Sequence, residues 1–163
     1  MKKSIYFLAF LTTGFVFSCN QPQNNGNQTA DDGSNTAIKD QCYLALSEAD
    51  TANLKIRTDA DGKVTGELEM RYGMKQNAVE RVINNGKVDG TFRGDTLFLN
   101  YLYTSGTLNN TLYQNPLALI KKGENLVLGV GEIVNSVGRS YFVKNKPINF
   151  ERGRFNFSPV ECK

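Results

Sequence analysis

Hydrophobic and polar residues alternate with a period of two through much of the middle of the chain, which predicts half-buried β-strands. The longest unbroken run covers residues 64–72, with polar side chains at every second position. Its apolar face consists of Val64, Leu68, Met70 and Tyr72. Leu54 and Ile56 predict the strand before it, and Asp-Ala-Asp-Gly at residues 59–62 predicts the turn that joins the two.

A short repeat indicates that the sheet curls. Gly-Lys-Val-Thr-Gly-Glu-Leu at residues 62–68 returns as Gly-Lys-Val-Asp-Gly-Thr-Phe at residues 86–92. Gly66 and Gly90 lie on the apolar face of their strands, and a glycine inside a strand marks a bend or a close approach of another group. We expect large side chains to fill the space beside them. The nearest candidates are Phe98, Tyr101 and Tyr103.

The remaining segments also predict short strands separated by turns. Gly94-Asp95 leads into an apolar strand at residues 96–103, and further strands are expected at residues 111–120, 126–130, 141–143 and 155–157. Residues 73–85 are predicted to form a long loop, with a helical turn on Val79, Val82 and Ile83. Residues 144–154 are predicted to form a second loop, with a helical turn near residues 149–151. The predicted fold is all-β: one antiparallel meander that curls into a small barrel or barrel-like sheet.

The N-terminus predicts export. Lys2 and Lys3 precede an apolar stretch at residues 5–17 and the small residue Ser18. This stretch is shorter than the roughly 20 residues that a membrane-spanning helix needs. We therefore interpret residues 1–18 as a signal peptide, with a buried N-terminal helix as the alternative.

Val16-Phe17-Ser18-Cys19 resembles the lipobox of bacterial lipoproteins. The resemblance implies that Cys19 carries lipid and anchors the chain in a membrane; a plain secretory signal is the alternative. Residues 19–39 are mostly polar and predict a flexible tether, followed by a globular domain at residues 40–163. Acidic residues after the cysteine favour surface display in Bacteroidota lipoproteins, and residues 20–22 hold none. We therefore expect an outer-membrane protein that faces the periplasm.

The numbers of cysteine and charged residues bear on disulfide bonding and on the class of partner. With Cys19 acylated, Cys42 and Cys162 remain at the two ends of the domain, and an oxidising compartment favours a disulfide between them over two free thiols. The chain has 19 basic and 16 acidic residues. Loss of Lys2 and Lys3 with the signal leaves a nearly neutral protein, for which we expect no nucleic-acid partner.

The candidate chemistry is sparse. The chain has no histidine, which excludes Ser-His-Asp catalysis and the commonest zinc ligand, and we predict no catalytic residue, metal or cofactor. Glu67 and Glu69 share a face but are interpreted as surface charges. Asp59 could begin a calcium loop, but Met70 stands where the twelfth-position glutamate is required, so a turn is favoured.

Two weaker patterns concern partners and modification. Five basic residues near the C-terminus could dock an anionic partner or simply be solvated. They are Arg139, Lys144, Lys146, Arg152 and Arg154. Thr51 and Thr96 each follow an aspartate and precede an apolar residue, which resembles the O-glycosylation sequon of exported Bacteroidota proteins.

The order of elements is similar to a group of small Bacteroidota lipoproteins. The shared features are the anchor cysteine, the tether, Cys42-Tyr43, the Val-x-Gly-x-Leu strand, the Gly-Asp-Thr-Leu turn and a terminal cysteine. The group has no established activity, so the resemblance implies class and location only. Two hypotheses follow: a non-enzymatic binding module for a small apolar ligand or an envelope protein, or a carboxylate-based hydrolase or isomerase with its site in the barrel.

Overall fold

The computed structural model describes residues 39–74, 76, 80–108, 110–137 and 139–163. The described residues belong to one compact unit. The predicted signal peptide, Cys19 and all but the end of the predicted tether lie outside the described residues. Within the described part of the chain, no helix is long and apolar enough to cross a membrane.

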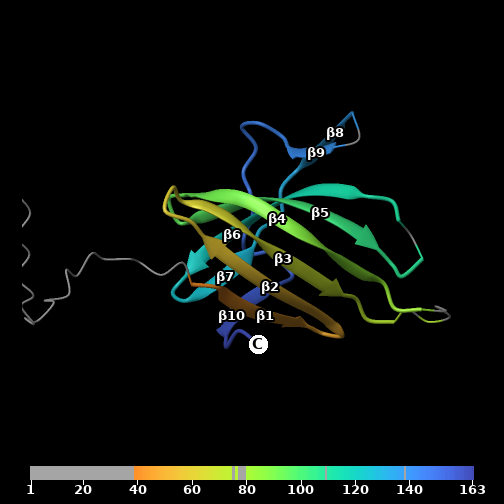
Figure 1. Ribbon diagram of the computed structural model, residues 1–163. Coiled ribbons are helices and arrows are strands. Elements are labelled where there is room, and N and C mark those ends of the chain that lie inside the picture. The colour runs from red at the N-terminus through yellow and green to blue at the C-terminus, as the bar shows by residue number, and fades with distance from the viewer. Residues whose placement is uncertain (1–38, 75, 77–79, 109, 138) are drawn as a thin grey trace, which may run out of the picture. The chain divides into compact units, whose positions relative to one another are not determined.

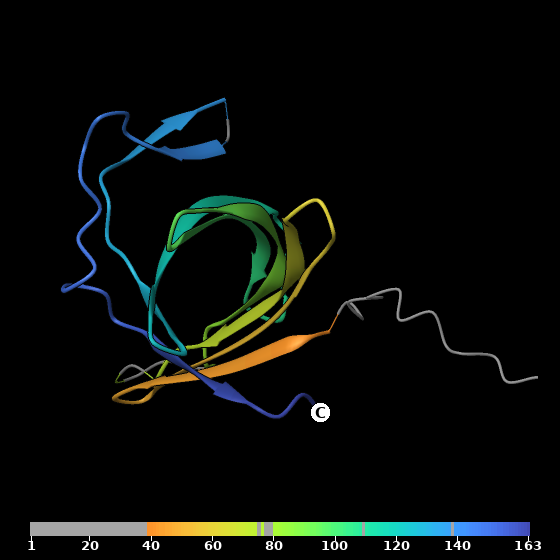
Figure 2. The ribbon, with the colours of Figure 1, turned by 90° about the vertical axis from the view of Figure 1, so that its left-hand side faces the viewer.

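The described residues form strands connected by turns and loops (Figure 1). The strands are β1 (Gln41–Ser47), β2 (Asp50–Thr58), β3 (Lys63–Arg71), β4 (Ile83–Arg93), β5 (Thr96–Ser105), β6 (Tyr113–Lys122), β7 (Asn125–Leu128), β8 (Ile133–Ser136), β9 (Arg139–Phe142) and β10 (Asn156–Val160). Eight of them close into an antiparallel barrel in the order β1-β10-β7-β6-β5-β4-β3-β2, and Figure 2 looks along it. The predicted all-β meander is confirmed, and closure leaves no open edge in this sheet.

The barrel closes where the two ends of the domain meet. β1 pairs with β10, and Cys42 lies opposite Val160 in this ladder. Two residues further on, Cys162 is bonded to Cys42, with 5.2 Å between the Cα atoms. The predicted disulfide is confirmed, and it links the first strand of the barrel to the end of the last.

The strand register confirms the inward glycines. Gly66 lies opposite Val88, and Gly90 lies opposite Val64, so both glycines share the inner face with buried valines. A Cβ on Gly66 would overlap the carbonyl oxygen of Lys55 on β2, and one on Gly90 would overlap that of Phe98 on β5. Glycine is therefore required because neighbouring backbones approach too closely for any side chain.

The expectation for Phe98 was wrong. Side chains alternate along β5, so the strand that turns Leu97, Leu99 and Tyr101 inward turns Phe98 outward. On the outer wall, the Arg93 guanidinium carbon lies 5.3 Å from the centre of the Phe98 ring.

The barrel interior is filled by side chains. An eight-stranded barrel is just wide enough for residues of its inner face to meet. The largest fully buried side chains are Tyr101, Phe157, Leu54, Ile56, Leu68, Leu97, Leu119, Leu126, Val64 and Val88. They come from most of the barrel strands, so the interior of the barrel is the hydrophobic core of the domain.

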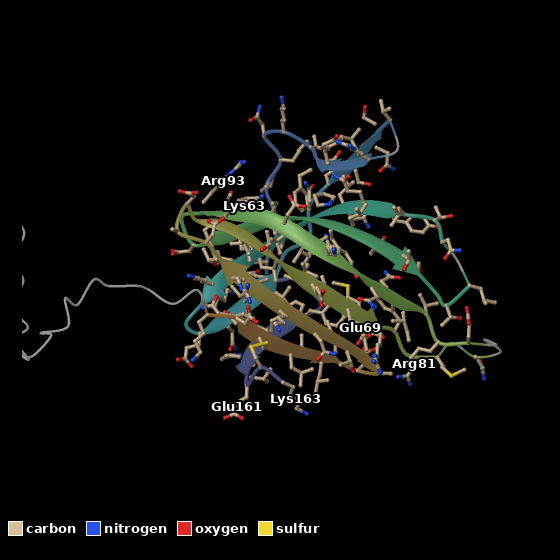
Figure 3. The ribbon with its side chains drawn as sticks, viewed as in Figure 1. Lys63, Glu69, Arg81, Arg93, Glu161 and Lys163 are labelled. Carbon is tan, nitrogen blue, oxygen red and sulfur yellow. A yellow bond between two sulfur atoms is a disulfide. The ribbon has the colours of Figure 1, made fainter. Side chains whose placement is uncertain are left out.

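The two ends of the barrel differ in their connections. At one end, which we call the turn end, strands are joined by residues 59–62, 94–95 and 123–124. The Asp59 carboxylate accepts hydrogen bonds from the backbone N–H groups of Asp61 and Lys63, which confirms the predicted turn. At the other, the loop end, residues 72–82 join β3 to β4 and residues 106–112 join β5 to β6. The connection from β7 to β10 also returns to the barrel there, because Arg154 pairs with Asp50. Lys63 and Arg93 mark the turn end in Figure 3, and Arg81 marks the loop end.

The long connection between β7 and β10, residues 129–155, differs from its prediction. It forms the hairpin β8–β9, of which β8 was not predicted. No helical turn forms at residues 149–151: the Asn149 backbone pairs with Val130 in an antiparallel bridge, and its side-chain oxygen accepts from the N–H groups of Glu151 and Arg152 in the bend that follows.

The loop before β4 also carries no helical turn in its described part. Ile83 begins β4, and the Val82 carbonyl accepts a hydrogen bond from the Tyr72 N–H, which continues the pairing of extended chains. Val79 lies outside the described residues.

Candidate functional site

The inner wall of the barrel changes character along its axis. Towards the turn end it is mainly apolar, whereas at the loop end phenols, amides and a carboxylate project from the same faces of the strands. These loop-end residues are Asp50, Tyr72, Asn84, Tyr101, Tyr103, Tyr113 and Asn115. The period-two alternation of each strand continues to its end, so polar residues at the strand ends still face inward.

The tyrosines form a contiguous cluster. Tyr101 and Tyr103 stack with their ring centres 4.5 Å apart, and Tyr103 stacks on Tyr113 at 5.6 Å. The Tyr101 hydroxyl donates to the backbone carbonyl of Leu68 at 2.9 Å. The Asn115 side-chain amide donates to the Tyr103 hydroxyl at 2.9 Å. Each of these bonds fixes a phenol at the boundary between the core and the loops.

Burial raises the pKa of the phenols of Tyr72, Tyr101 and Tyr103 above the ordinary value. The negative charge of Asp50 adds to the effect at Tyr72. The three hydroxyls therefore keep their protons at neutral pH. They present hydrogen-bonding groups and apolar surface to the loop end.

Asp50 is the buried acidic residue of the loop end, with 5% of its surface exposed. One carboxylate oxygen accepts a hydrogen bond from the Gly73 N–H at 2.7 Å, and the other pairs with the Arg154 guanidinium at 2.8 Å. A buried carboxylate is tolerated only when it is paired and hydrogen-bonded. Asp50 thus ties the start of β2 to the loop after β3 and to the residues before β10.

A groove of about 530 Å³ lies beside this carboxylate. Its walls come from the β1–β2 turn, the loop after β3 and Arg154. The lining residues are Glu48, Ala49, Asp50, Tyr72, Gly73, Met74, Glu80, Val82 and Arg154. Thr107 donates to Glu80 at 2.9 Å, which joins the next loop to the rim. The groove combines apolar, aromatic and charged surface, as ligand and peptide sites do.

A second hollow, of about 570 Å³, lies on the outer wall of β1–β3 beside the disulfide. Its polar lining includes Lys55, Glu67 and Glu69. Both hollows are therefore at the surface of the barrel.

The residues that the sequence analysis named as candidates lie in different parts of the structure. Glu69 pairs with Arg71 on the outer wall at 2.8 Å, and this is a surface ion pair. In the basic cluster, Arg154 pairs with Asp50, and Lys146 lies 3.7 Å from Glu132. The remaining members, Arg139, Lys144 and Arg152, are exposed.

Asp50 is the site residue that the sequence reading missed. The alternation of Leu54 and Ile56 extends back through Ala52 to Asp50, and this would have placed the carboxylate inside the barrel. Its partner Arg154 gives no such signal, because the contact depends on how the connection between β7 and β10 returns to the barrel.

No protein-family model matches the chain, and no curated protein or solved structure matches it either.

Proposed function

We propose that this protein is a lipid-anchored, non-enzymatic binding module of the cell envelope, which recognises its partner with the loop end of the barrel. The observation that carries the proposal is the groove beside Asp50, which is walled by the β1–β2 turn, the loop after β3 and Arg154 and lies above a filled core. Binding residues concentrate on loops that a rigid scaffold positions. A closed barrel with a disulfide at its seam is such a scaffold.

A ligand enclosed in the barrel is less well supported, because buried side chains occupy the space that an apolar molecule would need. A carboxylate enzyme is also less well supported. General acid–base work needs a carboxyl group that can reach substrate, whereas both oxygens of Asp50 are engaged by Gly73 and Arg154. The partner that best suits an open groove of mixed chemistry is an exposed segment of another envelope protein.

The proposed anchor rests on the resemblance of Val16-Phe17-Ser18-Cys19 to a lipobox. Incorporation of labelled fatty acid into the wild-type chain, and its loss in Cys19→Ala, is the expected result. Equal labelling of the two proteins would remove the anchor from the proposal.

Native mass spectrometry of the protein purified from its own envelope separates the binding modes. We expect the mass of the acylated chain, with no small molecule retained by the barrel. A bound apolar molecule that is released only on unfolding would replace loop-end recognition by a ligand-carrying function.

A further inference from the structure

The hairpin β8–β9 presents an apolar face outside the barrel. β9 lies against β6, and the hairpin stands beside the barrel wall in both ribbon views (Figures 1 and 2). Val134 lies opposite Tyr141, and both are about half exposed. Phe142 belongs to the opposite face and lies close to Gly131, whereas its pair on that face, Ile133, is 46% exposed. The face with Val134 and Tyr141 is exposed on the surface of the domain.

Val137 at the turn of this hairpin is 99% exposed and has a φ of 49°. A positive φ is a genuine outlier for a β-branched residue, and asparagine or glycine is the ordinary choice in such a turn. The isopropyl group of Val137 is therefore fully exposed on a strained backbone. Residues held in strained backbone conformations cluster at binding and other functional sites.

Positive charge accompanies the apolar face. Residues 129–155 hold five basic and two acidic residues, although the mature chain is nearly neutral. Arg139 lies opposite Ser136, which puts it on the same face as Tyr141 and next to the turn. Lys144 follows two residues after β9. Neither Arg139 nor Lys144 has an ion-pair partner among the described residues.

We propose that this hairpin docks on an anionic phospholipid surface. Val137 enters the bilayer below the headgroups, Tyr141 lies at headgroup level, and Arg139 and Lys144 meet the phosphates. Exposed apolar residues with aromatic and basic neighbours are the combination by which peripheral segments bind such surfaces. Charge complementarity favours lipid over a neutral protein strand as the occupant. The inference shares the membrane location of the proposed function, but it does not depend on recognition at the groove.

The test uses residues 36–163, because this compact unit holds the complete barrel, its core and its disulfide and lacks Cys19. Sedimentation is measured with vesicles of phosphatidylcholine alone and with vesicles containing one-third phosphatidylglycerol. We expect binding to the anionic vesicles only, weakened by salt. Arg139→Gln and Lys144→Gln should each lower the partition coefficient about fivefold. Lys63→Gln, at the turn end, is the matched charge control and should leave it unchanged.

Val137→Asn separates docking from folding. Asparagine suits the positive φ, so the hairpin should be at least as stable, yet vesicle binding should fall about tenfold because the apolar tip is lost. Leu46→Asn is the control, since Leu46 is 68% exposed on the wall of β1 and should not affect binding. Failure to bind anionic vesicles, equal binding to both vesicles, or full binding by Val137→Asn would overturn the proposal. None of these outcomes bears on the anchor or the groove.

Discussion

The hydroxyl of Tyr101 on β5 reaches over β4 to donate a 2.9 Å hydrogen bond to the carbonyl of Leu68 on β3. The residue of β4 opposite Leu68 is Gly86, which has no side chain to block the path. A Cβ on Gly86 would also overlap the carbonyl of Leu102 on β5. The inward glycine and the buried phenol are therefore parts of one arrangement, which closes the core beneath the loop end.

Tyr101→Phe removes this bond and keeps the ring. We expect the free energy of unfolding of residues 36–163 to fall by about 1 kcal/mol, measured by urea denaturation at neutral pH. The same variant should change the response to alkali. The pKa of Tyr101 is raised in the folded protein, so the unfolded chain releases this proton first as the pH rises through about 10. Stability is then complete below this pH and declines above it.

The decline above pH 10 should be shallower in Tyr101→Phe than in the wild type. It should not vanish, because Tyr43, Tyr72 and Tyr103 also have raised pKa values. Identical slopes in the two proteins would show that Tyr101 is not protected from ionisation by burial.

Gly66→Ala tests the close approach of β2 and β3. The new methyl group would overlap the Lys55 carbonyl, so the backbones must separate, and we expect a loss of about 1–3 kcal/mol in the free energy of unfolding. Gly62→Asn is the control. Gly62 has a φ of 77° in a turn with open space, and asparagine tolerates this conformation at a cost of a few tenths of a kcal/mol. Equal effects at the two sites would contradict the assigned roles.

The paired substitution Cys42→Ser and Cys162→Ser tests how much the disulfide contributes to closing the barrel between β1 and β10. The bond closes a loop across a sequence separation of 120 residues, for which the chain-entropy model gives about 4–5 kcal/mol. The oxidised wild type should exceed the double variant by several kcal/mol in urea denaturation, and reduction of the wild type should remove the difference. A difference below about 1 kcal/mol would mean that the β1–β10 ladder holds the barrel closed without the bond.

Arg154→Met tests the role of Asp50 in ordering the loop end. Loss of the guanidinium leaves a buried carboxylate without its ion-pair partner, which is strongly unfavourable. We expect the Gly73 amide, which donates to Asp50, to exchange its hydrogen at least tenfold faster. Arg152→Met, an exposed neighbour, is the matched control and should leave this amide unchanged. Unchanged exchange in Arg154→Met would show that the loops are held by other contacts.

The sequence predicted those features that depend on local pattern. Alternation around Val64 and Leu68, the repeated inward glycines and the two terminal cysteines led to a curled sheet with a closed seam. The error at Phe98 was one of phase, because an apolar residue was assigned inward without following the alternation from Leu97. The Asp50–Arg154 pair could not be predicted, since it depends on the path of residues 129–155, where turn signals are weak.

The most direct test of recognition at the loop end is photo-crosslinking in living cells. A photoreactive residue replaces Met74, which is 57% exposed on the rim of the groove, or Lys63, which is exposed at the turn end (Figure 3). We expect a discrete crosslinked product from position 74 that is absent from position 63. The same products from both positions, or none from position 74, would contradict the account.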